Sequence, residues 1–353
     1  MNFLSPTSSH WPRVLSIASS LLAVVLSLHV PIFAAPFASI PRLSQTTFLD
    51  AFEQTVAPSD SGTFIPLADE SQAQDFSSLL EVLLRGDIAA ADEDRQRLAD
   101  EGVQYRLVNI IDNGDTILGF LEAVRPGNKQ YRGWGAALAR LSPECDRVYA
   151  APHVQSDQYS EMIALRAFMD DPKACTLLLA GARRDADSGN VSGEDAANST
   201  ENLFHSLTAW LARRGLAIGR PLWFVQFHGA DDRSGQPSIV GSNGSRAASP
   251  AGSPLAMIED EVDAGGHVRM GVCGQESGLE KNQNGDYHLC ATGNAQGHLL
   301  AKLGVPQTFL HLEIERHVRE GFQHGTASGK AAVRDLLTAV RDVLNETGSN
   351  SVK

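Results

Sequence analysis

Motifs that bind nucleotides or supply a serine nucleophile are missing from this 353-residue sequence. It contains no G-x-G-x-x-G fingerprint and no P-loop, so no nucleotide cofactor is predicted. The serines in GNVSG and GQESG belong to no G-x-S-x-G motif and follow no predicted strand, which disfavours a serine esterase. Lysine and arginine form no cluster and the net charge is -13, which argues against nucleic acid as a partner.

Cysteine is scarce, and none of the four cysteines belongs to a C-x-x-C pair, which disfavours a cysteine-based zinc knuckle. An even number of cysteines in an exported chain predicts two disulfides. Four cysteines allow three pairings. Proximity in the sequence alone favours Cys145–Cys175 and Cys273–Cys290.

The N-terminus lacks charge, because Arg13 is the only charged side chain before Arg42. An apolar stretch covers about residues 14–28, and small residues follow near residues 34–39. This layout predicts a secretory signal peptide over residues 1–38 and therefore a secreted or periplasmic protein. Pro36 and Phe37 spoil the cleavage site, so an uncleaved membrane anchor is the alternative; a span needs roughly 20 residues.

Three further regions are predicted downstream: a helical prelude (39–103), an α/β domain (104–345) and a disordered tail (346–353). Apolar spacing of three and four residues predicts the helices of the prelude. A hairpin with its turn at residues 112–115 opens the domain. Strands that are apolar on both faces then alternate with helices, which indicates a mixed, largely parallel α/β sheet flanked by helices.

The individual elements follow from the same patterns. Polar, glycine-rich segments at residues 185–200 and 241–254 are predicted to be loops or mobile lids. Ser160 is the expected cap of a helix over residues 161–171, and Gly215 is expected to end a second helix. Strands are predicted in DRVYAAPH (146–153), CTLLLAGARRD (175–185), PLWFVQFHGAD (221–231) and QTFLHLEIERHVRE (307–320), with a terminal helix over 329–348.

Chemically capable side chains follow or close each of the four predicted strands. In open α/β sheets, ligands bind outside the carboxyl ends of the strands, so these side chains are expected to meet at one edge. The four strands present His153, Arg183 with Arg184, His228, and His311 with Glu313.

Two imidazoles and one carboxylate with an open coordination position are typical of catalytic zinc. His153, Asp157 and His228 are the predicted ligands, since one strand-to-helix turn can supply the first two. Glu313 lies on the polar face of its strand and is the predicted general base for a metal-activated water. Arg184 is predicted to bind a substrate carboxylate or a developing oxyanion.

Each of these residues also has an ordinary structural explanation. His153 could be a surface histidine, Asp157 a helix cap, and Glu161 a partner of the helix dipole. The other structural explanations are a core role for His228, an ion pair of Glu313 with Arg316 or Arg319, and a pair of Arg184 with Asp185 or Asp187. Together, these explanations would require all the polar groups to meet at strand ends by chance.

The order of these motifs resembles the zinc-carboxypeptidase-like amidohydrolases, especially phage-type poly-gamma-glutamate hydrolases and N-formylglutamate amidohydrolases. YSEMIA (159–164) stands where the polyglutamate hydrolases have T-S-E-I-A, and LEIERHVR (312–319) matches their L-E-L-S-R-x-x-R. The resemblance covers roughly residues 106–319. It implies that Asp157 is the ligand carboxylate and Glu313 the catalytic glutamate, with Arg316 and Arg319 also matched.

One departure concerns the third ligand. Neither H-x-x-E nor H-G-G-G-I-E is present, and the spacing here is His-x-x-x-Asp, so Glu161 is the alternative to Asp157. The sequence thus predicts an exported zinc-dependent hydrolase of amide or peptide bonds, on glutamate-like or peptide substrates. A non-catalytic exported binding or scaffold protein with a degenerate metal site is the alternative.

Overall fold

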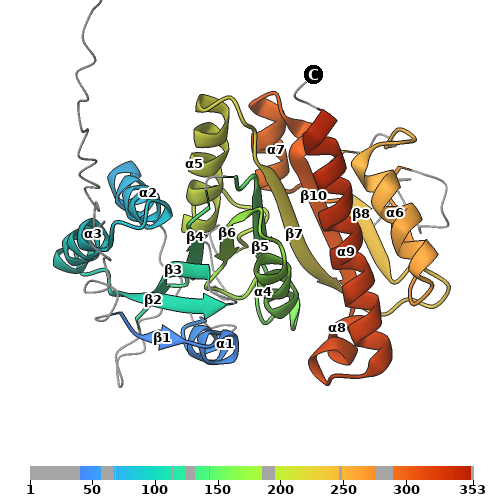
Figure 1. Cartoon of the computed structure of the whole chain (residues 1–353), viewed down its shortest axis with the longest axis horizontal. Coiled ribbons are helices and arrows are strands. Elements are labelled where there is room, and N and C mark those ends of the chain that lie inside the picture. Colours follow the sequence, from blue (N-terminus) through green and yellow to red (C-terminus); the bar gives the residue numbers. More distant parts are fainter. Residues whose placement is uncertain are drawn as a thin grey trace, which may run out of the picture. The chain divides into compact units, whose positions relative to one another are not determined.

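A ten-stranded mixed sheet runs through the described part of the chain, with the strand order β1-β2-β3-β4-β6-β5-β7-β10-β8-β9 (Figure 1). The structure is a computed structural model and describes residues 40–56, 67, 69–112, 115–123, 132–142, 144–184, 195–245, 249–274 and 289–350. All of these residues belong to one compact unit. The predicted signal segment and most of the predicted loop at 185–200 lie outside them.

The elements have the following bounds. The strands are β1 (Arg42–Leu43), β2 (Tyr105–Asp112), β3 (Asp115–Glu122), β4 (Ala136–Arg140), β5 (Arg147–Ala151), β6 (Ala174–Leu179), β7 (Trp223–Ala230), β8 (Ile239–Ser242), β9 (Met270–Val272) and β10 (Phe309–Glu315). The helices are α1 (Gln45–Glu53), α2 (Glu70–Leu84), α3 (Ile88–Asp100), α4 (Ser160–Asp170), α5 (Leu203–Ala217), α6 (Pro254–Gly265), α7 (Ala295–Lys302), η2 (Pro306–Thr308), α8 (Arg316–Gln323) and α9 (Ala327–Asn350).

Parallel pairing holds the centre of the sheet together. β5 lies parallel to both β6 and β7, and β7 lies parallel to β10. The predicted hairpin is present as β2 and β3, and it joins this centre through antiparallel β4. The predicted fold class, a mixed and largely parallel α/β sheet flanked by helices, is therefore confirmed.

The chain reverses its direction of travel across the sheet at β5. From β5 it passes through α4 to β6 on one side, and from β6 it returns through α5 to β7 on the other side. Such a reversal separates the two crossover connections and leaves a crevice at the carboxyl end of the first strand. The loop after β5 therefore lies at the position where open α/β sheets bind their ligands.

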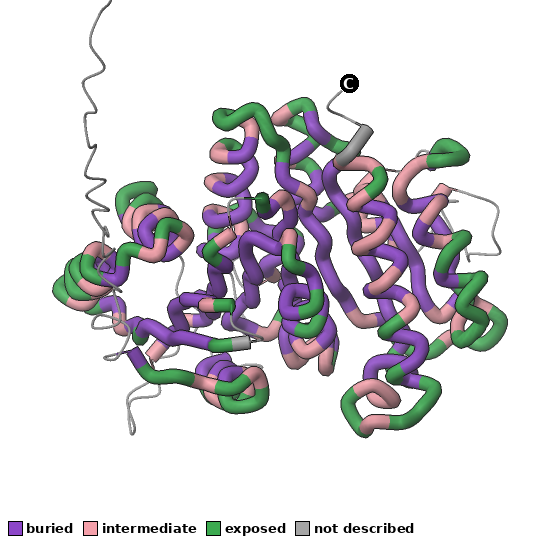
Figure 2. The backbone as a smooth tube through the Cα atoms, viewed as in Figure 1, coloured by how far each residue is buried: buried purple, intermediate pink, exposed green. Residues whose placement is uncertain are grey.

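Two hydrophobic clusters cover the two faces of the sheet. Figure 2 shows that the central strands are buried along most of their length. Val148 and Ala150 of β5 pack with α2, α3, α5 and α7, whereas Tyr149 and Ala151 pack with α1, α4, α6, α8 and α9. This alternation is expected for a strand buried on both faces. Because α1 to α3 contribute to these clusters, the helical region before the hairpin is part of the core.

A fully buried arginine at the start of β5 connects this central strand to the C-terminal helix. The guanidinium of Arg147 donates hydrogen bonds to Asp171 Oδ2 (2.6 Å), to Asn345 Oδ1 (2.8 Å) and to the Arg341 carbonyl (3.4 Å). Tyr149 donates its hydroxyl to the same Asp171 oxygen at 2.7 Å. A buried charge needs such partners, so β5 and α9 depend on each other.

Several boundary predictions are wrong. The strands predicted over 175–185 and 307–320 end at Leu179 and Glu315, and residues 316–320 belong to α8. Gly215 does not end α5, which continues to Ala217; a Cβ at Gly215 would lie 2.8 Å from the Arg220 carbonyl oxygen, so the glycine permits close approach of two backbone segments. Residues 346–350, predicted as disordered tail, belong to α9. The sequence patterns also missed β4, α6, β9 and α7, and β8 occupies the start of the predicted loop at 241–254.

Both predicted disulfides are present and confirm the pairing expected from proximity, with Cα–Cα distances of 4.9 Å for Cys145–Cys175 and 5.6 Å for Cys273–Cys290. Disulfides are typical of proteins in an oxidising environment. Within the described ranges, no helix has the length and apolar character needed to span a membrane.

Removing the Cys145–Cys175 bond should destabilise the protein. The bond closes a loop of 30 residues, and losing that constraint on the unfolded chain costs about 3.5 kcal/mol. The double variant Cys145→Ala/Cys175→Ala should therefore show a lower free energy of unfolding in urea. Cys273→Ala/Cys290→Ala, with a 17-residue loop, serves as the comparison and should lose slightly less. An unchanged midpoint in the first variant would contradict this expectation.

Candidate metal centre

The loop between β5 and α4 brings His153 and Asp157 to one side of a tight turn. The Asp157 N–H donates to the His153 carbonyl at 2.8 Å, and the Ser160 N–H donates to the Asp157 carbonyl at 3.0 Å. Tyr159 has φ of 71° and stands at the N-cap position of α4. Ser160, predicted to be the cap, is instead the first helical residue, and its buried hydroxyl has no partner.

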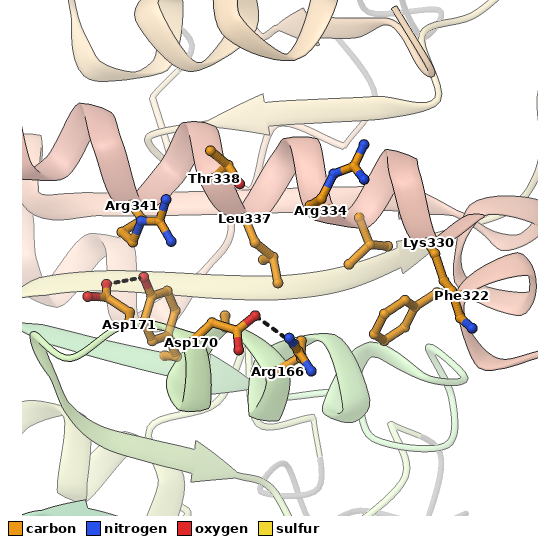
Figure 3. Close-up of a pocket in the computed structure, with 12 residues that line it drawn as sticks. Arg166, Asp170, Asp171, Phe322, Lys330, Arg334, Leu337, Thr338 and Arg341 are labelled. Atoms are coloured by element: carbon orange, nitrogen blue, oxygen red, sulfur yellow. Dashed lines mark hydrogen bonds and ion pairs between the residues drawn. The ribbon is translucent and has the colours of Figure 1, made fainter. Parts of the chain in front are cut away.

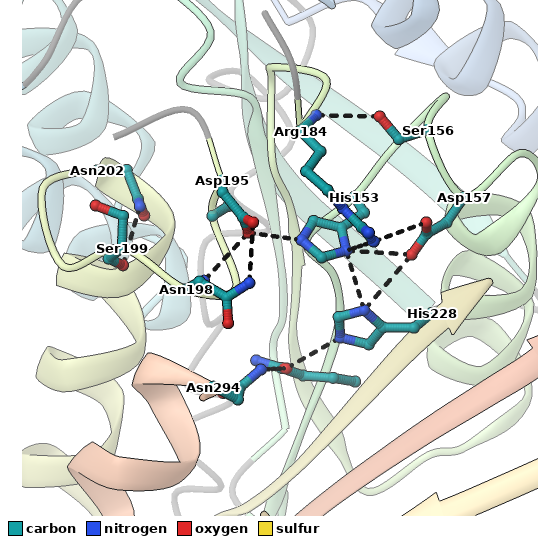
Figure 4. A network of polar contacts seen from close by, with 12 residues as sticks. His153, Ser156, Asp157, Arg184, Asp195, Asn198, Ser199, Asn202, His228 and Asn294 are labelled. Carbon is teal, nitrogen blue, oxygen red and sulfur yellow. Dashed lines mark hydrogen bonds and ion pairs between the residues drawn. The ribbon is translucent and has the colours of Figure 1, made fainter. Parts of the chain in front are cut away.

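Three nitrogen and oxygen donors converge beside this loop (Figure 4). The Nδ1 atoms of His153 and His228 lie 3.2 Å apart. Asp157 Oδ2 lies 3.2 Å from the first and 3.5 Å from the second. All three residues are buried. The structure thus brings together two loop residues and a β7 residue about 70 positions later in the sequence.

Hydrogen bonds on the far side of each ring orient the two imidazoles. His153 Nε2 lies 2.8 Å from Asp195 Oδ1, and His228 Nε2 lies 3.3 Å from Gln226 Oε1. Gln226 Oε1 in turn accepts a hydrogen bond from Asn294 at 2.8 Å. A proton on each Nε2 satisfies these acceptors and leaves the two Nδ1 atoms, 3.2 Å apart, with lone pairs that can bind a metal. Such outer partners are typical of metal-bound histidines.

The donor set fits a zinc ion. Bonds of 2.0–2.1 Å in a tetrahedron place neighbouring ligand atoms about 3.3 Å apart, and the three observed separations are 3.2, 3.2 and 3.5 Å. Two nitrogens and one carboxylate oxygen also leave one position open, as in catalytic zinc sites. The residues His153, Asp157 and His228 could therefore hold this metal once the Arg184 guanidinium, 2.6 Å from His153 Nδ1, moves aside.

Protonation states favour metal binding at two of the three ligands. Burial, with repulsion from His311, lowers the pKa of His228 to about 4, so this ring is neutral at pH 7. Burial acts to raise the pKa of Asp157, but its hydrogen bonds with His153 and His228 outweigh burial and lower it. Burial lowers the pKa of His153, whereas Asp157 and Asp195 raise it by a larger amount. A raised pKa means that metal competes with a proton at His153 up to a higher pH than at an ordinary histidine.

A second group of possible donors adjoins the first on neighbouring β10. His311 Nε2 lies 3.0 Å from Glu313 Oε1, and atoms of His228, His311 and Glu313 all lie within 4.8 Å of one another. Glu313 pairs with His228 in the parallel register of β10 and β7. Burial acts to raise the pKa of Glu313, but the hydrogen bond and charge of His311 outweigh it and lower the value. Glu313 is therefore an ionised carboxylate beside the donor set.

Glu161 lies apart from this donor set. It is 4% exposed in the first turn of α4, and its Oε2 atom has no hydrogen-bond partner. Burial raises its pKa to about 7, with a contribution from the charge of Glu53. None of the metal-compatible groups among the described residues contains Glu161, whereas one contains Asp157.

The arginines singled out in the sequence have different surroundings. Arg184 reaches the donor set, with one guanidinium nitrogen 2.6 Å from His153 Nδ1 and 3.1 Å from Asp157 Oδ1. Arg319 is buried and donates to the carbonyls of Ile314, Ala230 and Gln158, so it connects β10, β7 and the loop before α4. Arg316 forms an exposed ion pair with Asp231 at 2.7 Å. Glu313 therefore does not pair with either of these arginines.

The sequence patterns missed the outer partners Asp195, Gln226 and Asn294. Asp195 lies in the polar segment predicted as a loop, where no periodicity distinguishes one aspartate from another. Gln226 is two residues before His228 on the same strand face, which is the one available signal. A third possible donor group (Asp232, Glu315 and His317) is largely exposed, a common arrangement without a metal.

Fold and geometry therefore define a class: an α/β protein with a candidate mononuclear metal centre at its topological switch point. No family model matches the chain, and no curated protein matches it either.

The raised pKa of Glu161 predicts a pH-dependent stability. A carboxyl group whose pKa rises from 4.5 to about 7 on folding favours the folded state at low pH and opposes it as pH increases through 4.5 to 7. Glu161→Gln removes this opposition, so its unfolding free energy at pH 8 should exceed the parent's by an amount on the order of 3 kcal/mol. Near pH 4.5 this advantage should vanish.

Urea unfolding at the two pH values measures this difference. Glu101→Gln, at an exposed position, provides the matched control and should change stability little at either pH. A Glu161→Gln variant that follows the parent at both pH values would show that the Glu161 carboxyl is ordinary.

Proposed function

We propose that this chain is an extracytoplasmic, zinc-dependent hydrolase of amide or peptide bonds. The single observation that supports this proposal most is the convergence of His153 Nδ1, His228 Nδ1 and Asp157 Oδ2 at separations suited to tetrahedral zinc. Its position at the switch point of the sheet adds to this support, because ligands of open α/β sheets bind there.

In the proposed reaction, the three ligand residues hold zinc and Glu313 transfers the proton. Zinc bound at this centre would supply Lewis acidity toward a substrate carbonyl and would lower the pKa of a water molecule to about 7. Glu313 then takes a proton from the attacking water. The water oxygen forms a bond to the carbonyl carbon, the carbon–nitrogen bond breaks, and Glu313 returns the proton to the leaving amine. The ionised state of Glu313 suits it for the first transfer.

Arg184 is the proposed substrate-binding residue. Its side chain is 48% exposed and its guanidinium lies at the donor set, so it can reach both solvent and the reacting group. A planar guanidinium forms paired hydrogen bonds with a carboxylate. Together with the motif resemblance to polyglutamate and formylglutamate hydrolases, this favours glutamate-like or peptide substrates.

Export is part of the proposal. The two disulfides support it, because disulfides are typical of proteins in oxidising compartments. The predicted signal peptide at residues 1–38 would deliver the chain to such a compartment, secreted or periplasmic, or would anchor it to the membrane if uncleaved.

A second candidate function is a non-catalytic binding or scaffold protein on the same fold. One observation favours it: the Arg184 guanidinium donates toward His153 Nδ1 and Asp157 Oδ1, two groups that a metal would need. If this contact persists, a cation from the protein itself replaces the metal ion. Zinc content distinguishes the two candidates.

Purified protein should contain about one zinc per chain. His153→Ala, Asp157→Ala and His228→Ala should each lose it, because each removes a donor, whereas Glu161→Ala should keep it. Inductively coupled plasma mass spectrometry measures the content. Zinc lost in Glu161→Ala but kept in Asp157→Ala would correct the ligand assignment. A parent that takes up no zinc after incubation would favour the scaffold protein.

Glu313→Gln should retain zinc but lose activity. Loss of the general base lowers the hydrolysis rate by about 10² to 10⁴-fold. Release of amines from N-acyl-glutamate and gamma-glutamyl peptides, with and without a chelator, is the assay. Glu320→Gln on nearby α8 is the control and should keep the parent's rate. Full activity in Glu313→Gln would exclude this residue as the base.

A further inference from the structure

A groove separate from the candidate metal centre lies between α4 and α9 (Figure 3). Its volume is about 310 Å³, which falls at the lower end of the range for small-molecule sites, about 300–1,000 Å³. Tyr149 of β5 contributes to its floor and packs with the α4 and α9 side of the sheet. Phe227 and Leu312, the strand neighbours of His228 and Glu313, belong to the same hydrophobic cluster as Tyr149. His228 and Glu313 therefore point to the opposite face of the sheet from this groove.

The walls of the groove are apolar in its middle part. Leu337 of α9 and Phe322 of α8 project toward α4, as Figure 3 shows. Ala167 faces them from α4, and Val333 lies one turn from Leu337 along α9. These side chains can bury the hydrocarbon part of a ligand, which stabilises binding in proportion to the apolar area removed from water.

The rim of the groove carries more cations than anions. Arg166, Lys330, Arg334 and Arg341 stand against two carboxylates, Asp170 and Asp171. The Asp171 carboxylate is already hydrogen-bonded to buried Arg147 at 2.6 Å, and Asp170 is paired with Arg166 at 2.6 Å. Lys330, Arg334 and Arg341 are therefore left as the excess positive charge.

These three cations differ in their competing partners. Arg334 pairs with its largely buried neighbour Asp335 at 3.3 Å, and Arg341 pairs with Asp342 at 2.9 Å. Lys330 forms no ion pair within the described part of the chain. The chain as a whole has a net charge of -13, so the excess positive charge in this groove favours anions as ligands.

We propose that this groove binds a small organic anion with an apolar body. The carboxylate or phosphate head is bound by Lys330, the rim cation without an ion pair in the described part of the chain, and the hydrocarbon part lies along Phe322, Val333 and Leu337. Charge complementarity and the apolar floor together select this class over uncharged apolar compounds and over inorganic anions.

Calorimetric titration of the full chain with octanoate, octyl phosphate and octanol tests the site. Octanoate or octyl phosphate should bind at least about tenfold more tightly than octanol, and comparing the two identifies the preferred head group. Inorganic phosphate alone should bind more weakly than octyl phosphate, because it lacks the apolar part. Equal binding of octanol and both anions, or no binding of either anion, would overturn the proposal.

A matched pair of charge reversals assigns the binding to the groove. Lys330→Glu should weaken anion binding by about tenfold or more, whereas Arg334→Glu should weaken it less, because the Arg334 guanidinium points away from α4 (Figure 3) and pairs with Asp335. Lys302→Glu makes the same change at an exposed position on α7 and should leave binding unchanged. Thermal unfolding establishes that all three variants are folded. Equal affinity in Lys330→Glu and Lys302→Glu would place the ligand elsewhere.

Discussion

Two imidazole nitrogens, Nδ1 of His153 and Nδ1 of His228, lie 3.2 Å apart in a buried site, and this close pair constrains everything around it. If both nitrogens carry lone pairs, they repel each other unless a proton or a cation lies between them. The fold supplies an anion, Asp157, that stabilises either species. It also supplies an acceptor behind each ring, so the rings cannot rotate away without losing a hydrogen bond. The arrangement therefore favours a cation beside the two rings, and the Arg184 guanidinium lies 2.6 Å from His153 Nδ1.

Much of this arrangement could be predicted from the sequence because parallel strands end at a common edge. His153, His228 and Glu313 follow or close apolar runs, and the topology brings all three to the carboxyl ends of β5, β7 and β10. Asp157 was predictable from its spacing to His153 in one turn. The disulfides were predictable because cysteines close in the sequence need little loop closure to meet.

Other features depend on contacts that no local pattern encodes. Asp195 reaches His153 from 42 residues away, out of a segment that resembles any polar linker. Serine is a common helix cap, yet Tyr159 takes the N-cap position in a left-handed conformation, so α4 begins at Ser160 itself. Gly215 looks like a stop signal, but its lack of a side chain serves packing against Arg220 and Leu222. Short strands such as β8 and β9 are fixed by pairing with neighbours, which only the assembled sheet shows.

The hydrogen bonds of Arg147 have a consequence for the order in which the molecule can be completed. Arg147 is the first residue of β5. Two acceptors of its guanidinium, the Arg341 carbonyl and the Asn345 side chain, are synthesised about 195 residues later. Until α9 docks, β5 cannot bury this charge with its full set of acceptors. A nascent chain therefore cannot complete its native core until α9, the last helix of the described chain, has been made.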